Sequence, residues 1–347
     1  MSLRPLLIAF CFVLQTIPGT AAFAAPDGQH DFDFQVGTWT VHVKLLLHPL
    51  SGSTSWVQYD GTHVVSKVWG GRANLGVLEI DGPSRHIEGQ SLRLYNPKTH
   101  QWSFTFAQSG EGTMGPPMIG EFKGGRGEFF NQGTYNGRAV LVRSITSDIT
   151  PTTYRDEYAY SADGGRTWET NWIATFTLAN GKTQTAPAFD SSDPQQHAFD
   201  FEWGTWRAHL RRLLHPLTGS HTWVSYDGPS VVRKIWNGRA NLGEINLAGS
   251  AGRIVGLSLR LYNPRAHQWG ISFSAFGDGI LGTPTVGAFI NGRGEFYDQE
   301  TLANGRAIYV RFVFSDVSRT HFHFEQAFSD DGGQTWEVNW IADFTKP

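Results

Sequence analysis

QHDFDFQVGTWTVH (Gln29–His42) is the stretch that decides the fold, because it occurs again as QHAFDFEWGTWRAH (Gln196–His209). The following stretch, LLHPLSGSTSWVQYDG (Leu46–Gly61), likewise returns as LLHPLTGSHTWVSYDG (Leu213–Gly228). The two copies are offset by 167 residues until copy 2 gains one residue within Thr301–Gly305. A residue present in both copies has a role in each, whereas a residue present in only one cannot be essential to the shared fold.

The repeat divides the chain into segments. Residues 1–24 are expected to be a secretory signal peptide, because a positive start and an apolar run precede the small-x-small site Ala22-Phe23-Ala24. This predicts a periplasmic or secreted protein. Residues 29–177 and 196–347 are the two copies, each of about 150 residues and therefore long enough to bury its own core. The polar segment 178–195 between them is expected to be a linker.

Charge and cysteine content exclude several classes of function. A formal net charge of −3 without a long basic run argues against nucleic-acid binding. The apolar run in the signal is too short to span a bilayer, so we expect no membrane span. The only cysteine, Cys11, lies inside the signal, so a mature chain would have no disulfide or cysteine nucleophile. The sequence has no serine elbow, phosphate loop or dinucleotide fingerprint, and we expect no cofactor.

Short alternating segments predict β-strands throughout each copy. SLRLY (Ser91–Tyr95) and WSFTFA (Trp102–Ala107) alternate on either side of an Asn-Pro turn, which is typical of a hairpin. SADGGRTW (Ser161–Trp168) and SDDGGQTW (Ser329–Trp336) place Asp-Gly-Gly between two strands, a turn that glycine permits at positive φ. The 40 glycines and many aromatic residues favour closed barrels. We therefore predict an all-β fold of two tandem antiparallel barrels.

The motifs resemble those of known barrels. Gly-x-Trp in the first strand (Gly37 and Trp39, Gly204 and Trp206) is similar to the opening of calycin barrels, the lipocalins and fatty-acid-binding proteins. The SLRLYNP-x-x-x-QW stretch, the GRGEF turn and the ending FEQAFSDDGGQTWEVNWIADFTKP resemble an uncharacterised bacterial family of calycin-like domains. The resemblance covers nearly all of both copies and implies a calycin-like barrel for each. It implies no particular activity.

Two arginines of each copy lie in the middle of strands among apolar neighbours. A buried guanidinium needs a carboxylate or an anionic ligand. Arg93 and Arg143 therefore either pair with Glu157 or Glu128, face solvent, or bind the acidic group of a ligand inside the barrel. With the aromatic residues expected to form the cavity wall, the predicted ligand-binding residues are Arg93, Arg260, Arg143, Arg311, Trp172, Trp340, Tyr95 and Tyr262.

The last strand of each copy has one aromatic face. Alternation in WETNWIATF (Trp168–Phe176) places Trp172 inside the barrel and Glu169 and Asn171 outside. Because the polar pair recurs as Glu337 and Asn339, it is a candidate for a surface between the two copies.

Histidines and glutamates provide candidates for acid–base catalysis. His48 and His215 precede proline in a loop after the first strand, where they either cap backbone groups or act at a barrel mouth. Glu157 and Glu325 are candidate bases.

A metal site is a further hypothesis for copy 2. His321, His323 and Glu325 alternate along one strand and share a face, as two histidines and a carboxylate do in open metal centres. The alternative is an exposed polar stripe opposite phenylalanines. Copy 1 has Thr153 and Arg155 at the histidine positions, so it would hold no metal.

Three functions remain open from the sequence. We favour a binding protein whose barrels hold a small apolar or aromatic, possibly acidic, molecule. The alternative is a cofactor-free isomerase, lyase or hydratase that uses lumen histidine or glutamate with Arg93 and Arg260 stabilising negative charge. The third is a structural module in which the two copies pair within the chain like a fused dimer.

Overall fold

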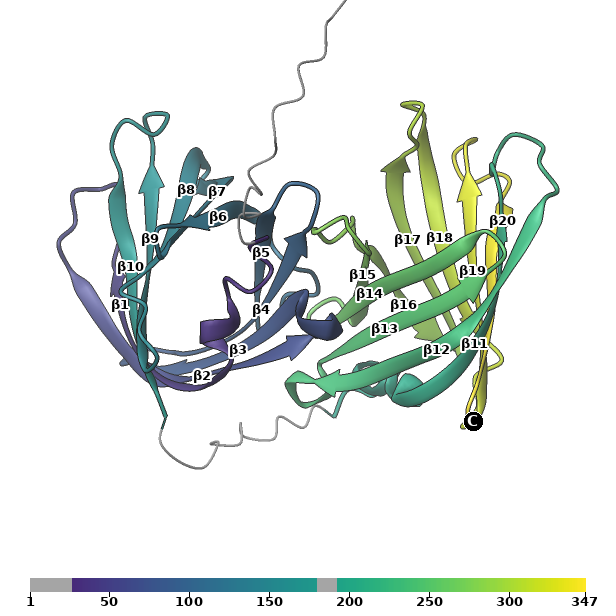
Figure 1. Cartoon of the computed structure of the whole chain (residues 1–347), viewed down its shortest axis with the longest axis horizontal. Helices are drawn as coiled ribbons and strands as arrows, with labels where there is room; N and C mark the ends of the chain where they lie inside the picture. The colour runs from purple at the N-terminus through teal and green to yellow at the C-terminus, as the bar shows by residue number, and fades with distance from the viewer. Residues whose placement is uncertain (1–26, 180–191) are drawn as a thin grey trace, which may run out of the picture.

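The computed structural model describes residues 27–179 and 192–347 (Figure 1). The predicted signal peptide, residues 1–24, and most of the predicted linker lie outside the described residues. Within the two described ranges, no helix is long and apolar enough to cross a membrane.

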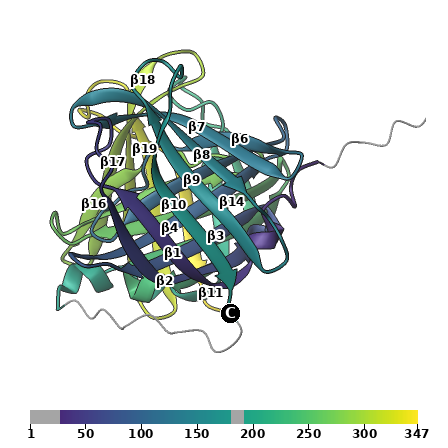
Figure 2. The same ribbon diagram turned by 90° about the vertical axis from the view of Figure 1, so that its left-hand side faces the viewer.

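Copy 1 forms a closed ten-strand antiparallel barrel, called barrel 1, in which each strand pairs with its neighbours in sequence and β1 pairs with β10. Figure 2 shows β1, β9 and β10 tilted across one wall of this barrel. Its strands are β1 (Gly37–Leu46), β2 (Trp56–Val68), β3 (Ala73–Asp81), β4 (His86–Asn96), β5 (Gln101–Gln108), β6 (Met118–Lys123), β7 (Arg126–Tyr135), β8 (Arg138–Ser147), β9 (Thr153–Ser161) and β10 (Glu169–Leu178).

Copy 2 forms a second closed barrel, barrel 2, with the same strand order. The predicted fold class, two tandem antiparallel barrels, is therefore confirmed. Its strands are β11 (Gly204–Leu213), β12 (Trp223–Ile235), β13 (Ala240–Gly249), β14 (Gly252–Asn263), β15 (Gln268–Ala275), β16 (Thr285–Ile290), β17 (Arg293–Thr301), β18 (Ala307–Ser315), β19 (His321–Ser329) and β20 (Glu337–Thr345). Short 3-10 helices are η1 (Asp33–Gln35), η2 (Trp69–Gly71), η3 (Pro194–His197), η4 (Asp200–Glu202) and η5 (Trp236–Gly238).

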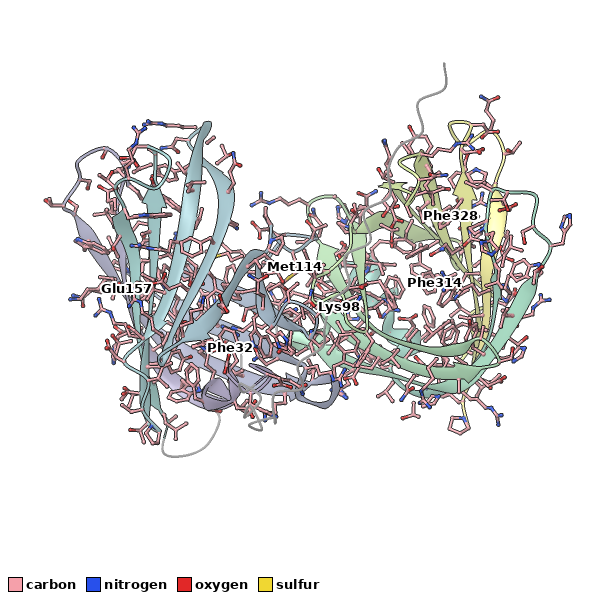
Figure 3. The ribbon with its side chains drawn as sticks, turned by 45° about the horizontal axis from the view of Figure 1, so that its top comes forward. Phe32, Lys98, Met114, Glu157, Phe314 and Phe328 are labelled. Carbon is pink, nitrogen blue, oxygen red and sulfur yellow. The ribbon has the colours of Figure 1, made fainter. Side chains whose placement is uncertain are left out.

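The repeated Gly-x-Trp motif fixes a short helix against one end of each barrel. The Trp39 indole N–H donates to the Gln35 carbonyl of η1 at 2.7 Å, and Trp206 donates to the Glu202 carbonyl of η4 at 2.6 Å. Phe32, which precedes η1, is buried against Trp102 with ring centroids 5.1 Å apart (Figure 3). The stretch that is repeated most closely therefore builds the same aromatic floor beneath each lumen.

The two barrels pack against each other through matching strands. One buried apolar cluster combines residues of β3 and β4 with residues of β13 and β14, which Figure 1 shows side by side. Met114 lies between the barrels and packs on this cluster (Figure 3). Arg239 of barrel 2 also pairs with Glu88 of barrel 1, its Nη1 lying 2.7 Å from Oε2. The corresponding Arg72 instead stacks on Phe276, with Cζ 3.9 Å from the ring centroid.

Candidate functional site

Barrel 1 encloses a cavity of about 360 Å³. Its wall is largely aromatic and includes Phe104, Phe106 and Trp172. Pockets of this size that combine apolar walls with a few polar groups are typical of small-molecule sites.

Arg93 of β4 faces this cavity, as one sequence-based alternative required. Its side chain is only 4% exposed, and Nη1 donates to Asn74 Oδ1 at 3.1 Å and to Ser91 Oγ at 3.3 Å. The guanidinium carbon lies 5.0 Å from the Phe32 ring and 4.8 Å from the Phe104 ring. Among the described residues Arg93 makes no ion pair, so its positive charge lacks a directly bonded carboxylate.

Asp156 of β9 is the nearby carboxylate that the sequence analysis missed. It lines the same cavity and accepts a hydrogen bond from Thr146 Oγ1 at 2.6 Å. Burial raises the pKa of Asp156 to about 6, although the Thr146 hydrogen bond and the Arg93 charge oppose the increase. Alternation with the neighbouring Tyr154 and Tyr158 was the signal that could have placed it inside.

A histidine and an asparagine complete the polar end of this cavity. His63 of β2 lies 3.1 Å from the Tyr154 hydroxyl through Nδ1, and burial, together with the Arg93 charge, lowers its pKa to about 3. His63 is therefore neutral at physiological pH. Asn171 of β10 is buried, lines the cavity, and has no hydrogen-bond partner for Nδ2 among the described residues.

The expected position of Asn171 on the outside was wrong. A register shift between Thr170 and Trp172 breaks the alternation of β10, so Asn171 and Trp172 both line the lumen. Glu169 accepts a hydrogen bond from the Leu50 amide in its own barrel, which ties down the loop after β1. The pair therefore does not form a surface between the copies.

Barrel 2 encloses a smaller cavity of about 250 Å³. Arg260 lines it and donates to Asn241 Oδ1 at 3.0 Å and to Ser258 Oγ at 3.2 Å, as Arg93 does in barrel 1. Unlike Arg93, it also forms an ion pair with Glu202 at 3.2 Å. Glu202 stands where copy 1 has Gln35, and burial raises its pKa to about 7 against the opposing Arg260 charge. Trp340 lines this cavity as predicted.

Four predicted ligand-binding residues lie elsewhere. Arg143 and Arg311 stack on Trp168 and Trp336, each guanidinium carbon lying 4.6 Å from the ring centroid. Val142 of β8 and Phe312 of β18 line the two lumens, so the adjacent Arg143 and Arg311 lie on the opposite faces of these strands. The structure therefore favours the outward-facing alternative for Arg143 and Arg311 over a place in the lumen.

Tyr95 and Tyr262 are also not part of the cavity lining. They are buried in the aromatic clusters at the floor, where Tyr95 contacts His100 at 3.1 Å and Tyr262 donates to Asp193. Their predicted place in the cavity wall is therefore corrected to the barrel core.

The predicted acid–base residues do not face either cavity. Glu157 pairs with Arg155 on the face of β9 opposite the lumen (Figure 3). Glu325 lies 3.3 Å from His323 on the face of β19 opposite the lumen. His48 and His215 are exposed in turns at φ 55° and 56°. Their carbonyls accept hydrogen bonds from Ser51 and Thr218. Glu157 and Glu325 therefore lie outside the lumens, and His48 and His215 lie in the loop after the first strand of each barrel, as expected.

His321, His323 and Glu325 share one face of β19, as the alternation predicted. The two histidines lie beside the Asp343 carboxylate. His323 Nδ1 lies 2.7 Å from Asp343 Oδ1, and His321 Nε2 lies 3.5 Å from the same atom. In the part of the chain that the structure describes, no group of three or more potential ligands has the arrangement of a metal site.

No family model and no curated protein matches the chain. Among solved structures, the chain is similar to an S-type phycobiliprotein lyase from Guillardia theta, with 11% identity and a TM-score of 0.34 over 44% of this chain and 93% of that one. It is also similar to a protein of unknown function from the DUF3598 family of Nostoc punctiforme, with 9% identity and a TM-score of 0.29 over 92% of this chain and 99% of that one.

Proposed function

We propose that this protein is exported and that barrel 1 binds a small molecule with an apolar or aromatic body and an acidic group. The observation that carries the proposal is Arg93, a buried arginine that faces an aromatic cavity without an ion pair. The corresponding Arg260 already has Glu202 as its partner. The calycin-like sequence motifs are consistent with this role.

The chemistry of the arginine favours a carboxylate. A guanidinium presents a planar set of N–H donors that matches the two oxygens of a carboxylate, and such charged hydrogen bonds strengthen in a low-dielectric site. Asn171 adds an unpartnered N–H to the same cavity. Phe104, Phe106 and Trp172 supply surface for the apolar body.

Isothermal titration calorimetry with decanoate, decanol and decylammonium tests the head group while the apolar chain stays the same. We expect decanoate to bind most tightly at pH 6, and Arg93→Met to weaken decanoate by about tenfold or more. Arg143→Met is the matched control, because Arg143 belongs to the same barrel but stacks on its outer face. Equal binding of decanoate and decanol, or unchanged binding by Arg93→Met, would contradict the proposal.

Export has its own test. N-terminal sequencing of protein recovered outside the cytoplasm is expected to begin at Ala25, after the small-x-small site. A mature protein that retains residues 1–24 would contradict export but would leave the binding assay unaffected.

A second candidate, cofactor-free proton transfer in barrel 1, is favoured by the raised pKa of Asp156. A carboxyl group that titrates near 6 can both accept and donate a proton close to neutral pH. Arg93 in the same cavity would stabilise a developing oxyanion. An infrared titration of wild type minus Asp156→Asn tests this role. A midpoint near 6 supports it, and a midpoint near 4 excludes it.

A further inference from the structure

The lumen of barrel 2 carries the opposite balance of charge from that of barrel 1. The barrel-1 lining contains two arginines, Arg85 and Arg93, and one carboxylate, Asp156. The barrel-2 lining contains one arginine and three carboxylates, which are Arg260, Glu202, Asp298 and Glu300. The duplicated cavities therefore differ in the sign of the ligand charge that they favour.

Asp298 is the group that most needs a partner. It lies on the lumen face of β17, and both of its carboxylate oxygens are hidden from solvent without a hydrogen-bond donor among the described residues. Burial and the Glu300 charge raise the pKa of Asp298 to about 7. A buried acceptor that lacks a donor costs free energy, which a ligand carrying N–H groups would recover.

These two carboxylates are specific to copy 2. Asp298 and Glu300 stand where copy 1 has Asn131 and Gly133, so the shared barrel fold does not need them. Both line the cavity from the same face of β17, where Glu300 is exposed and Asp298 is half-buried.

A third acidic group lines the same cavity. Glu202 is 1% exposed and lines the cavity, where it neutralises Arg260. Its Oε2 atom accepts no hydrogen bond from any described residue, although the ion pair brings Arg260 Nη2 to within 3.2 Å. Because Glu202 already pairs with Arg260, this arginine is less available to bind an acidic ligand. Glu202 Oε2 and both Asp298 oxygens can still accept hydrogen bonds.

Aromatic rings surround these carboxylates. Phe273, Phe312 and Trp340 line the cavity, and Phe324 occupies the position at which copy 1 has Asp156. The negative faces of aromatic rings attract cations, and the attraction strengthens where water is excluded. Carboxylates beside aromatic walls are the combination that recognises an ammonium group on an apolar body.

We propose that barrel 2 is a second, separate binding site that takes an organic cation, namely a protonated amine carried on an apolar or aromatic body. The ammonium group donates hydrogen bonds to Asp298, the exposed Glu300 carboxylate attracts it, and the body packs on the phenylalanine and tryptophan rings. This inference concerns the other barrel and does not rest on the acid site proposed above.

Calorimetry on the mature full-length protein at pH 8, where Asp298 is ionised, tests this with decylammonium, decanol and decanoate. We expect decylammonium to bind barrel 2 at least about tenfold more tightly than decanol. Asp298→Asn and Glu300→Gly introduce the residues of copy 1. Together they are expected to make decylammonium bind no more tightly than decanol. Glu295→Gln is the matched control, since Glu295 lies on the outer face of the same strand and pairs with Arg293.

Two results would overturn the inference. One is decylammonium binding that is no tighter than decanol binding, and the other is an advantage that survives Asp298→Asn with Glu300→Gly. Thermal unfolding shows whether the double variant is folded, and Asp298→Asn alone repeats the test if it is not. Arg93→Met is expected to leave decylammonium binding unchanged, so failure in one barrel is separable from failure in the other.

Discussion

At the residue scale, the same arginine has a different carboxylate in each barrel. Arg93 shares its cavity with Asp156, which approaches from β9 but forms no ion pair with it among the described residues. Arg260 is bonded directly to Glu202 from η4. Both copies keep the arginine, but its carboxylate comes from a different element in each, so the two lumens differ in charge.

The titration of Asp156 predicts a pH dependence of acid binding. Because its pKa is about 6, Asp156 is neutral below that pH and negatively charged above it. A ligand carboxylate has an ordinary pKa well below 6 and stays charged, so repulsion by Asp156 grows as pH rises. We expect calorimetry to show decanoate binding weakening between pH 5.5 and 7.5.

Asp156→Asn keeps a hydrogen-bonding group beside Thr146 and removes the charge. This variant is expected to bind decanoate with nearly the same affinity at both pH values, and more tightly than wild type at pH 7.5. Glu157→Gln, on the outer face of the same strand, is expected to keep the wild-type pH dependence. A pH dependence that persists in Asp156→Asn would assign the effect to another group.

Three substitutions are expected to convert the charge preference of barrel 2. Glu202→Gln, Asp298→Asn and Glu300→Gly introduce the copy-1 residues and leave Arg260 as the only charged group in the lining. Calorimetry at pH 8, where the wild-type Glu202 and Asp298 carboxylates are ionised, is expected to show a second decanoate site in this variant, raising the stoichiometry from one to two. A stoichiometry that stays at one in a folded variant would show that charge does not decide which ligand enters.

The sequence predicted Arg93 and Arg260 as lumen residues because both copies keep them in the middle of a strand. It could not single out Asp156 or Glu202, since each occurs in only one copy and comparison of the copies favours what is shared. The residues that differ between the copies give the two lumens their different charge, and a search for shared residues gave them no weight.

At the scale of elements, alternation and glycine turns predicted strands well but could not predict where alternation breaks. The Asp-Gly-Gly turns connect β9 to β10 and β19 to β20 as expected. The register shift in β10 reverses the expected side of Asn171, and no residue type in that stretch signals it. This register shift therefore places Asn171 in the lumen instead of on the outer face of β10.

A close approach of two strands predicts a glycine requirement. A Cβ atom on Gly287 of β16 would lie 1.8 Å from the Glu295 carbonyl oxygen of β17, a contact with backbone that side-chain movement cannot relieve. Gly287→Ala is therefore expected to destabilise the protein by about 2 kcal/mol or more in urea unfolding. Gly133→Ala, whose added Cβ lies 3.4 Å from Val142 Cγ2, is the control. Equal stabilities would refute the argument.

At the scale of the whole molecule, the two barrels share a buried interface that the sequence left undetermined. In β4 the segment from Gly89 to Tyr95 is buried on both faces, so alternation could not tell the lumen face from the interface face. Leu92 and Leu94 join the shared cluster with Leu259 and Leu261, while Arg93 between them points into the lumen. The sequence therefore predicted the duplication, whereas the surface on which the two barrels pack could be identified only from the structure.

One residue weakens this interface. Gln90 is 0% exposed, and both atoms of its amide lack hydrogen-bond partners among the described residues. Copy 2 has Leu257 at the same position, inside the apolar cluster. Gln90→Leu is expected to stabilise the protein by about 1 kcal/mol, because it removes buried polar atoms that make no hydrogen bond. Urea unfolding that shows a loss of stability would contradict this reading of the interface.

A crystal structure of the mature protein with decanoate tests the central proposal most directly. We predict the decanoate carboxylate within hydrogen-bonding distance of the Arg93 guanidinium, its chain against the aromatic wall of barrel 1, and no decanoate in barrel 2. Decanoate bound outside that lumen, or inside it with its carboxylate away from Arg93, would contradict the proposal.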